Sequence, residues 1–271
     1  MGKGRFILIT LLALAVVGGL VWEIMRNREP VYEGEPLSFW LQGYDQDQRT
    51  ETSIQAADQA LQHLGTNAIP TLLRLIQAED PPLERKLFAW LGKQHYVKVH
   101  HISDFERRNQ ALIGFGKLGA DGRGAVPDLL KIHQHGRTTE DRVCVIRALG
   151  SIGPAAKSAM PRLLEWLATQ SDVYNRSDLC IRGNLVWAIG QIHSDPQAAV
   201  PELIKYLADN EKSGITATAI HALGAYGADA KPAIPALLHS LNRQDRFVPQ
   251  EAYNALKQID SNSVVGLSLP Q

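Results

Sequence analysis

An internal repeat constrains the fold of this 271-residue chain more than any other feature. Four segments align without gaps from a glycine to a proline eleven residues later, and they read GKLGADGRGAVP, GSIGPAAKSAMP, GQIHSDPQAAVP and GAYGADAKPAIP. They begin at Gly116, Gly150, Gly190 and Gly224, a shorter copy ends at Pro70, and a half copy starts at Ala252. Recurrence at a basic period of 34 residues is typical of stacked helical units.

Each copy predicts a first helix, a loop and a second helix. Before the loop, apolar residues recur at the spacing of one helix face, as in Val145, Ala148, Leu149 and Ile152. The second position of this face is always small, which lets neighbouring helices approach closely: Ala60, Gly114, Ala148, Ala188, Ala222 and Ala255. We expect Gly119, Gly153 and Gly227 to end first helices, because glycine adopts positive φ without steric cost. The closing prolines suit the first turn of the second helices.

The repeats predict an all-α fold, an α-α superhelix of about five helical pairs plus caps over residues 37–262. The first two closing prolines lie 57 residues apart, which indicates an insertion near residues 81–105. This insertion begins with an amphipathic helical pattern and continues as HYVKVHHIS, the one β-like alternation in the chain. Residues 263–271 are expected to form a flexible tail.

Residues 1–28 are predicted to form an N-terminal membrane anchor with one transmembrane helix. Residues 6–22 are 17 uncharged residues, at the short end of the length that spans a bilayer. A cleaved secretory signal is the alternative, but the Ala13-x-Ala15 site lies inside the apolar run and no small-residue site follows it. We expect a single-pass protein of the cell membrane, with the remainder of the chain on the non-cytoplasmic side. Residues 29–36 (EPVYEGEP) are expected to be an extended linker, followed by a short helix over residues 37–41.

Composition argues against several classes of function. The chain has 28 basic and 28 acidic residues, so it lacks the positive surplus that a nucleic-acid-binding protein needs. Two cysteines cannot make a disulfide framework or a four-cysteine zinc site, and we expect Cys144 and Cys180 to pack as small buried residues. The histidines at 95, 100, 101, 133 and 135 lack the helical pairing with a carboxylate partner that a metal site needs. We expect no catalytic, cofactor-binding or metal-binding residues.

The recurring A-L-G-x-I-G-x-x-A-x-x-A-[hydrophobic]-P-x-L-L pattern resembles HEAT repeats, especially those shared with bacterial phycobilin lyases, over roughly residues 53–259. Residues 36–41 (PLSFWL) are similar to a P-L-S-x-W-L segment of bacterial membrane-anchored HEAT proteins. The resemblance implies a non-catalytic scaffold that binds a protein partner, because most HEAT proteins are interaction scaffolds. The alternative is a bilin lyase-like enzyme or a cofactor-handling HEAT protein, with Trp166, Trp187 and Tyr206 lining a tetrapyrrole pocket.

The second helices supply the candidate partner-binding residues, since the resemblance implies that they line the concave face. The fifth residue after each closing proline lies on the flank of the core face: Leu75, Ile132, Trp166, Tyr206 and Ser240. We expect a protein or peptide to bind this concave face, with Trp166, Tyr206 and Ile132 as anchors. Arg162, Glu165 and Lys205 would form its polar rim. The alternative is that the flank residues only pack neighbouring helices together.

Overall fold

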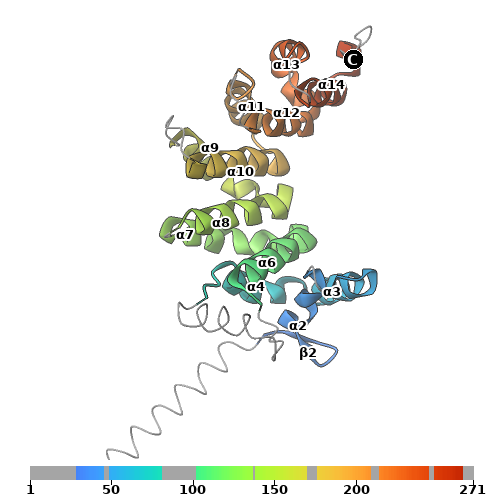
Figure 1. Cartoon of the computed structure of the whole chain (residues 1–271), viewed down its shortest axis with the longest axis vertical. Coiled ribbons are helices and arrows are strands. Elements are labelled where there is room, and N and C mark those ends of the chain that lie inside the picture. The colour runs from blue at the N-terminus through green and yellow to red at the C-terminus, as the bar shows by residue number, and fades with distance from the viewer. Residues whose placement is uncertain are drawn as a thin grey trace, which may run out of the picture.

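The computed structural model describes residues 29–45, 49–80, 102–136, 138–169, 176–208, 214–243 and 247–264, and here the chain forms stacked helix pairs (Figure 1). The first helices are α3 (Glu51–Leu64), α6 (Asp104–Leu118), α8 (Thr139–Ile152), α10 (Arg176–Ile192), α12 (Ile215–Ala225) and α14 (Val248–Ile259). The second helices are α4 (Ile69–Ile76), α7 (Val126–His135), α9 (Met160–Thr169), α11 (Pro196–Lys205) and α13 (Ile234–Ser240). The prediction of an all-α fold built from helical pairs is confirmed.

Local sequence signals set where these helices begin and end. Three first helices open with a reciprocal capping box, formed by Thr50 with Ser53, Ser103 with Glu106, and Thr138 with Asp141. Glycines with φ between 48° and 70° end four first helices: Gly65, Gly119, Gly153 and Gly227. From these glycines 3₁₀ segments lead to the second helices: η2 (Gly65–Ala68), η3 (Gly119–Ala125), η4 (Gly153–Ala159) and η5 (Gly227–Ala233).

The unit of α10 and α11 departs from this scheme. It lacks the capping glycine, and His193 and Asp195 adopt the positive φ values of 34° and 51° instead. As a result α11 already begins at Pro196, and the closing proline of the repeat, Pro201, lies inside the helix. The prediction that this proline occupies the first helical turn was therefore wrong for this unit. The residues before Pro201 are already α-helical, whereas the aligned residues of the preceding unit form the 3₁₀ segment η4.

The aligned glycines set the spacing between consecutive first helices. A Cβ atom on Gly190 would lie 2.6 Å from the Cβ atom and 2.8 Å from the Cα atom of Ala222 on the next first helix. A Cβ atom on Gly150 would lie 2.4 Å from the Trp187 ring. At the equivalent position of α6, a Cβ atom on Gly116 would meet only Ser151, at 3.7 Å. The close approach of α8, α10 and α12 therefore depends on small residues.

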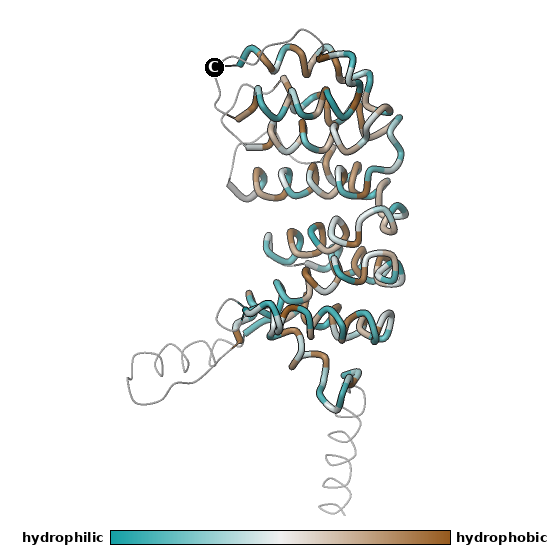
Figure 2. Tube along the Cα trace, turned by 90° about the vertical axis from the view of Figure 1, so that its right-hand side faces the viewer, coloured by the Kyte–Doolittle hydropathy of each residue, from teal (hydrophilic) through white to brown (hydrophobic). Residues whose placement is uncertain are grey.

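The core runs the length of the stack between the two layers. The amphipathic pattern of the helices is visible as alternating apolar and polar turns in Figure 2. The leucines two positions after the closing prolines are fully buried, and these are Leu72, Leu129, Leu163, Leu203 and Leu237. Leu149 of α8 is also fully buried. Helix α14 closes the stack by packing against α12 and α13, with Ala252, Leu256 and Ile259 buried.

The stack is curved, and the curve corrects one expectation. The first helices from α6 to α14 pack closely on one another, whereas the second helices α9 and α11 contact each other sparsely. In Figure 1, α3 and α14 lie to the right of the middle of the stack, and α7, α9 and α11 lie along its left edge. The second helices therefore lie on the outer side of the curve. Their expected position on the concave face was wrong, because the tightly packed glycine-containing helices occupy the shorter, inner side.

Residues 29–36 also differ from the expectation of an extended linker. They form a hairpin of β1 (Val31–Tyr32) and β2 (Glu35–Pro36), which pair antiparallel across a turn at Glu33 and Gly34. The expected short helix follows as α2 (Leu37–Leu41), continued by η1 (Gln42–Tyr44). Glu29 forms an ion pair with Arg74 of α4. The hairpin and α2 thus pack against the first unit as an N-terminal cap.

Three sequence-based predictions concern segments outside the described residues. These are the anchor at residues 6–22, the histidine-containing insertion at 81–101, and the tail from residue 265 onward. Helix α6 begins at Asp104, so the expected insertion boundary at residue 105 lies inside a helix. The described part of the chain ends with η6 (Ser261–Val264), in which Val264 is buried. The expected start of the flexible tail at residue 263 was therefore wrong, because residues 263 and 264 still belong to this packed 3₁₀ segment. Among the helices that the structure describes, none has the length and apolar character needed to cross a membrane.

Candidate partner-binding surface

The structure places the three proposed anchor residues on neighbouring second helices. Ile132 lies on α7, Trp166 on α9 and Tyr206 at the C-cap of α11, and all three side chains are partly buried against the core. The equivalent residues at the two ends of the stack, Leu75 and Ser240, are buried. The flank position is therefore open to solvent only in the middle of the second-helix layer, where its residues are large.

Trp166 has a neighbour that the sequence analysis did not connect with it. The ring of His133 from α7 stacks on the indole, with ring centroids 3.5 Å apart and an interplanar angle of 15°. Burial of this imidazole, with a smaller contribution from the nearby Arg142, lowers its pKa from 6.5 to about 4. The ring is therefore uncharged at neutral pH, which suits a parallel stack on an apolar aromatic face. The stack joins α7 to α9 and fixes the orientation of the indole.

The proposed rim residues are exposed and pair with charges on their own helices. Arg162 Nη1 and Glu165 Oε2 lie 2.6 Å apart on α9, and Lys205 Nζ and Glu202 Oε1 lie 2.7 Å apart on α11. Pairs of this kind, three residues apart on an exposed helix surface, contribute little to stability. Each pair lies on a helix that leads to one of the two aromatic residues, and each pair is neutral overall.

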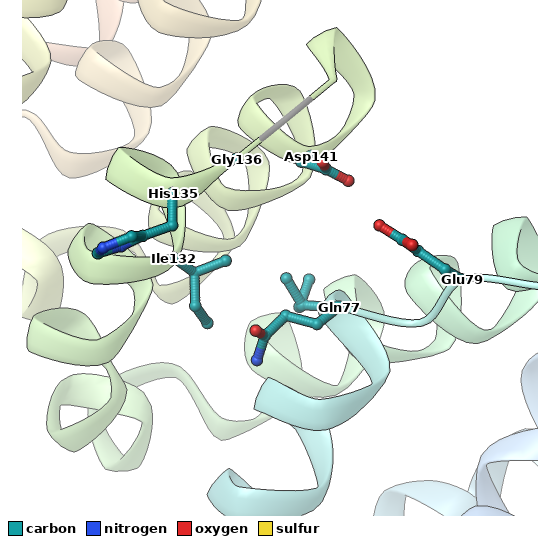
Figure 3. Close-up of a pocket in the computed structure, with 7 residues that line it drawn as sticks. Gln77, Glu79, Ile132, His135, Gly136 and Asp141 are labelled. Carbon is teal, nitrogen blue, oxygen red and sulfur yellow. The ribbon is translucent and has the colours of Figure 1, made fainter.

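A pocket of about 180 Å³ lies beside Ile132, between the C-terminal ends of α4 and α7 (Figure 3). Its walls are formed by Ile76, Gln77, Glu79, Ile132, His135, Gly136 and Asp141. The carboxylates of Glu79 and Asp141 face each other across the opening in Figure 3. Drug-sized ligands occupy larger cavities, of roughly 300 to 1,000 Å³, so this pocket suits a single side chain.

Asp141 is already engaged in the fold. Its carboxylate accepts a hydrogen bond from the backbone N–H of Thr138 at 3.0 Å and lies 3.1 Å from Arg108 Nη2. Glu79, in contrast, is exposed at the end of α4. The polar side of the pocket therefore combines one structural carboxylate with one exposed carboxylate, opposite the apolar side chains of Ile76 and Ile132.

Sequence reasoning found the anchor residues but missed His133, Glu79 and Asp141. His133 directly follows Ile132 and precedes Trp166 by 33 residues, nearly one repeat, so repeat spacing was the available signal. No comparable signal existed for Glu79, because it belongs to the segment between the second helix of one unit and the insertion. Asp141 was identifiable only as a capping residue that follows Thr138.

The first-helix layer contains two further pockets, each with a cysteine in its wall. One, of about 200 Å³, lies between α6 and α8 and includes Cys144, and another, of about 390 Å³, lies between α10 and α12 and includes Cys180. Both thiols are free. Burial raises the pKa of Cys144, and the neighbouring Arg108 opposes this rise. Cys180 is exposed and Cys144 is only partly buried, so the expectation of two buried cysteines was wrong.

The described residues also bear on metal binding. Among them, no group of three or more histidine, cysteine, aspartate or glutamate side chains is arranged to hold a metal ion. The three histidines of the insertion, at positions 95, 100 and 101, lie outside this part of the chain.

Comparison with known proteins identifies the class of repeat. Residues 175–257 match the family described as HEAT repeats. This stretch spans α10 to α14, and the earlier units show the same helix-loop-helix arrangement. No curated protein and no solved structure matches the chain. Residues 175–257 therefore contain HEAT repeats, which are helical scaffolds that generally mediate protein binding.

Proposed function

We propose that this protein is a non-catalytic scaffold that binds a protein or peptide on the outer surface of its second helices. The observation that supports the proposal most directly is the stack of Trp166 on His133, the residue that follows the pocket-lining Ile132 in α7. An aromatic ring held in one orientation loses little conformational freedom when a partner covers it, which favours its use as an anchor. Tyr206 extends this surface to the next second helix.

The outer layer suits this role better than the inner layer does. The second helices are spaced apart, so side chains between them stay accessible, whereas the first helices are packed closely through Gly150 and Gly190. Balanced ion pairs around Trp166 and Tyr206 resemble the polar rim of a protein interface. The single-side-chain size of the pocket favours recognition of a peptide side chain over binding of a large cofactor.

The proposal includes a location. Residues 6–22 form an uncharged apolar run that follows Lys3 and Arg5 and has no good cleavage site after it. We propose that this run anchors the protein in the cell membrane as a single span, with the HEAT repeats on the non-cytoplasmic side. The scaffold then presents its partner-binding surface next to that face of the membrane.

Co-purification of partners tests the proposed site. The intact protein is purified from its own membranes as wild type and as the double variant Trp166→Ala/Tyr206→Ala, and bound proteins are identified by mass spectrometry. We expect the double variant to lose partners that wild type and the exposed-residue control Lys131→Ala retain. Circular dichroism verifies that all three proteins are equally folded. Undiminished recovery of partners by the folded double variant would reject the site.

The lyase-like alternative has a separate and inexpensive test. The purified protein is incubated with a bilin, washed, and examined by absorbance spectroscopy. We expect no visible band to remain with the protein. A retained band that disappears in the Trp166→Ala/Tyr206→Ala variant would favour a bilin-handling protein over a protein-binding scaffold.

A further inference from the structure

We propose that the N-terminal cap of the stack rests on the bilayer surface through an apolar patch formed by Val31, Pro36 and Phe39. This inference depends on the proposed membrane anchor and adds a second, non-spanning contact with lipid. The cap lies at one end of the stack, and α14 lies at the other end (Figure 1). The contact would therefore hold the repeats with their long axis directed away from the membrane.

Two of the three apolar residues of the patch are exposed, and Pro36 is partly exposed. Val31 is 57% exposed and Phe39 is 48% exposed. In the hairpin Val31 pairs with Pro36 and Tyr32 pairs with Glu35, and residues paired across an antiparallel ladder share one face. Tyr32 packs against the core, so Val31 and Pro36 occupy the face directed away from the first unit. Phe39, on the helix that follows, adds an aromatic ring to the exposed apolar surface.

The patch is held rigidly by the residues beneath it. The indole Nε1 of Trp40 donates a hydrogen bond to the backbone oxygen of Tyr32 at 3.1 Å, which ties α2 to the hairpin. The ring of Tyr32 lies 5.0 Å from that of His63 in α3, and Phe39 packs edge-on against Trp40 with centroids 5.4 Å apart. The exposed apolar groups therefore need no rearrangement before they meet a surface.

The position of the patch in the chain indicates which surface covers it. Only residues 23–30 separate the apolar run at 6–22 from Val31. Eight residues reach at most about 28 Å when fully extended, so an anchored chain keeps the patch close to the bilayer. A short tether gives an effective concentration in the millimolar range, at which even a weak apolar contact with lipid becomes occupied.

The charges near the patch define the kind of lipid. Glu33 in the turn and Glu35 on the opposite face of the hairpin are both exposed within a few residues of the patch. These carboxylates disfavour a surface of anionic headgroups at close range. Contact of Val31 and Phe39 with the acyl boundary of zwitterionic lipid is therefore the favoured mode, since Phe and Val partition into apolar regions.

Spin-label accessibility tests this contact in the full-length chain. The protein, with Cys144→Ala and Cys180→Ser, is reconstituted in phosphatidylcholine vesicles and labelled with a nitroxide at Phe39→Cys or at Phe247→Cys. Phe247 is a matched control because it is 65% exposed and precedes α14 at the far end of the stack. Collision with oxygen, which enters lipid, is compared with collision with a water-soluble nickel complex.

We expect a several-fold higher oxygen-to-nickel collision ratio at position 39 than at position 247. Equal ratios at the two positions, with the chain still resistant to alkaline carbonate extraction, would overturn the lipid contact and leave the anchor intact. Exclusion of both reagents at position 39 would also overturn it, because a protein surface would then cover the patch. Release of the chain by carbonate would refute the proposed anchor, and the lipid contact would fall with it.

Discussion

At the scale of single residues, glycines determine how closely the first helices approach one another. Gly190→Ala places a methyl group within 2.8 Å of the Ala222 backbone, and overpacking of this kind costs about 1–3 kcal/mol. Gly116→Ala at the equivalent repeat position meets no atom closer than 3.7 Å, and replacing a helical glycine with alanine gains up to about 1 kcal/mol. We expect opposite shifts of the urea midpoint for these two variants. Equal midpoints would show that the glycine contact does not set the helix spacing.

His133 makes the stability of the fold depend on pH. Its pKa is lowered from 6.5 to about 4 in the folded chain, by burial first and by Arg142 second. Between these pH values the unfolded chain binds a proton that the folded chain does not bind. The contribution of uncharged His133 to the free energy of unfolding is therefore complete above pH 6.5 and is lost progressively as the pH falls to 4. Because the ring is partly exposed, we expect a loss of only about 1 kcal/mol.

The measurement is the free energy of unfolding at several pH values for wild type and His133→Gln. We expect the variant to show a shallower decline between pH 6.5 and 4.5, since it lacks the group that takes up the proton. His135→Gln is the control, because it removes a histidine from the same helix and leaves the stack on Trp166 in place. If the free energy of unfolding of His133→Gln declines with falling pH as steeply as that of wild type, His133 is not the group that takes up the proton.

At the scale of whole elements, α14 is the cap of the C-terminal end. It covers the apolar faces of α12 and α13 with Ala252, Leu256 and Ile259. Removal of residues 248–271 uncovers these faces, and terminal repeats without a cap lose stability and solubility. We expect this truncation to lower the unfolding midpoint and to increase binding of a hydrophobic dye. A chain that lacks only residues 265–271 should behave as wild type, which separates the effect of α14 from that of chain length.

Helix ends and pairings were predictable from sequence because the signals are local. Gly119, Gly153 and Gly227 end first helices as expected, since positive φ is a property of one residue. The hairpin at residues 31–36 was missed because strands of two residues give too short an alternation to recognise. The side of the curve on which each layer lies was assigned wrongly, because curvature depends on the difference in spacing between layers. The stack of His133 on Trp166 was missed for the same reason, because it depends on how the second helices of neighbouring units are spaced.

At the scale of the whole molecule, the proposals define one orientation. The N-terminal cap faces the membrane and the stack extends from it. Helix α9, which carries Trp166, and helix α11, whose C-cap is Tyr206, lie in the outer layer farther along the stack (Figure 1). A partner bound there is held at a fixed distance from the bilayer, because consecutive units are joined by a continuous core. The number of units between the cap and the binding surface then sets that distance. A solenoid can therefore act as a spacer without any catalytic activity.

The direction in which the chain crosses the membrane gives the last prediction. Lys3, Arg5 and the N-terminal amino group precede the apolar run, whereas Arg26 and Arg28 follow it together with Glu23 and Glu29. The net positive charge is therefore larger before the apolar run than after it. This difference favours a cytoplasmic N-terminus and places residues 30–271 outside the cytoplasm. A reporter enzyme that is active only outside the cytoplasm, fused after Gln271, should therefore be active.

The N-terminus of the mature protein, determined by mass spectrometry, should lie at or next to Met1, because the Ala13-x-Ala15 site is inside the apolar run. A fusion that is active only with a cytoplasmic reporter would reverse the orientation. A mature chain that begins after Ala15 would replace the anchor with a cleaved signal. The partner-binding surface would then belong to a protein released from the membrane, and the contact of Phe39 with lipid would lose the tether on which it depends.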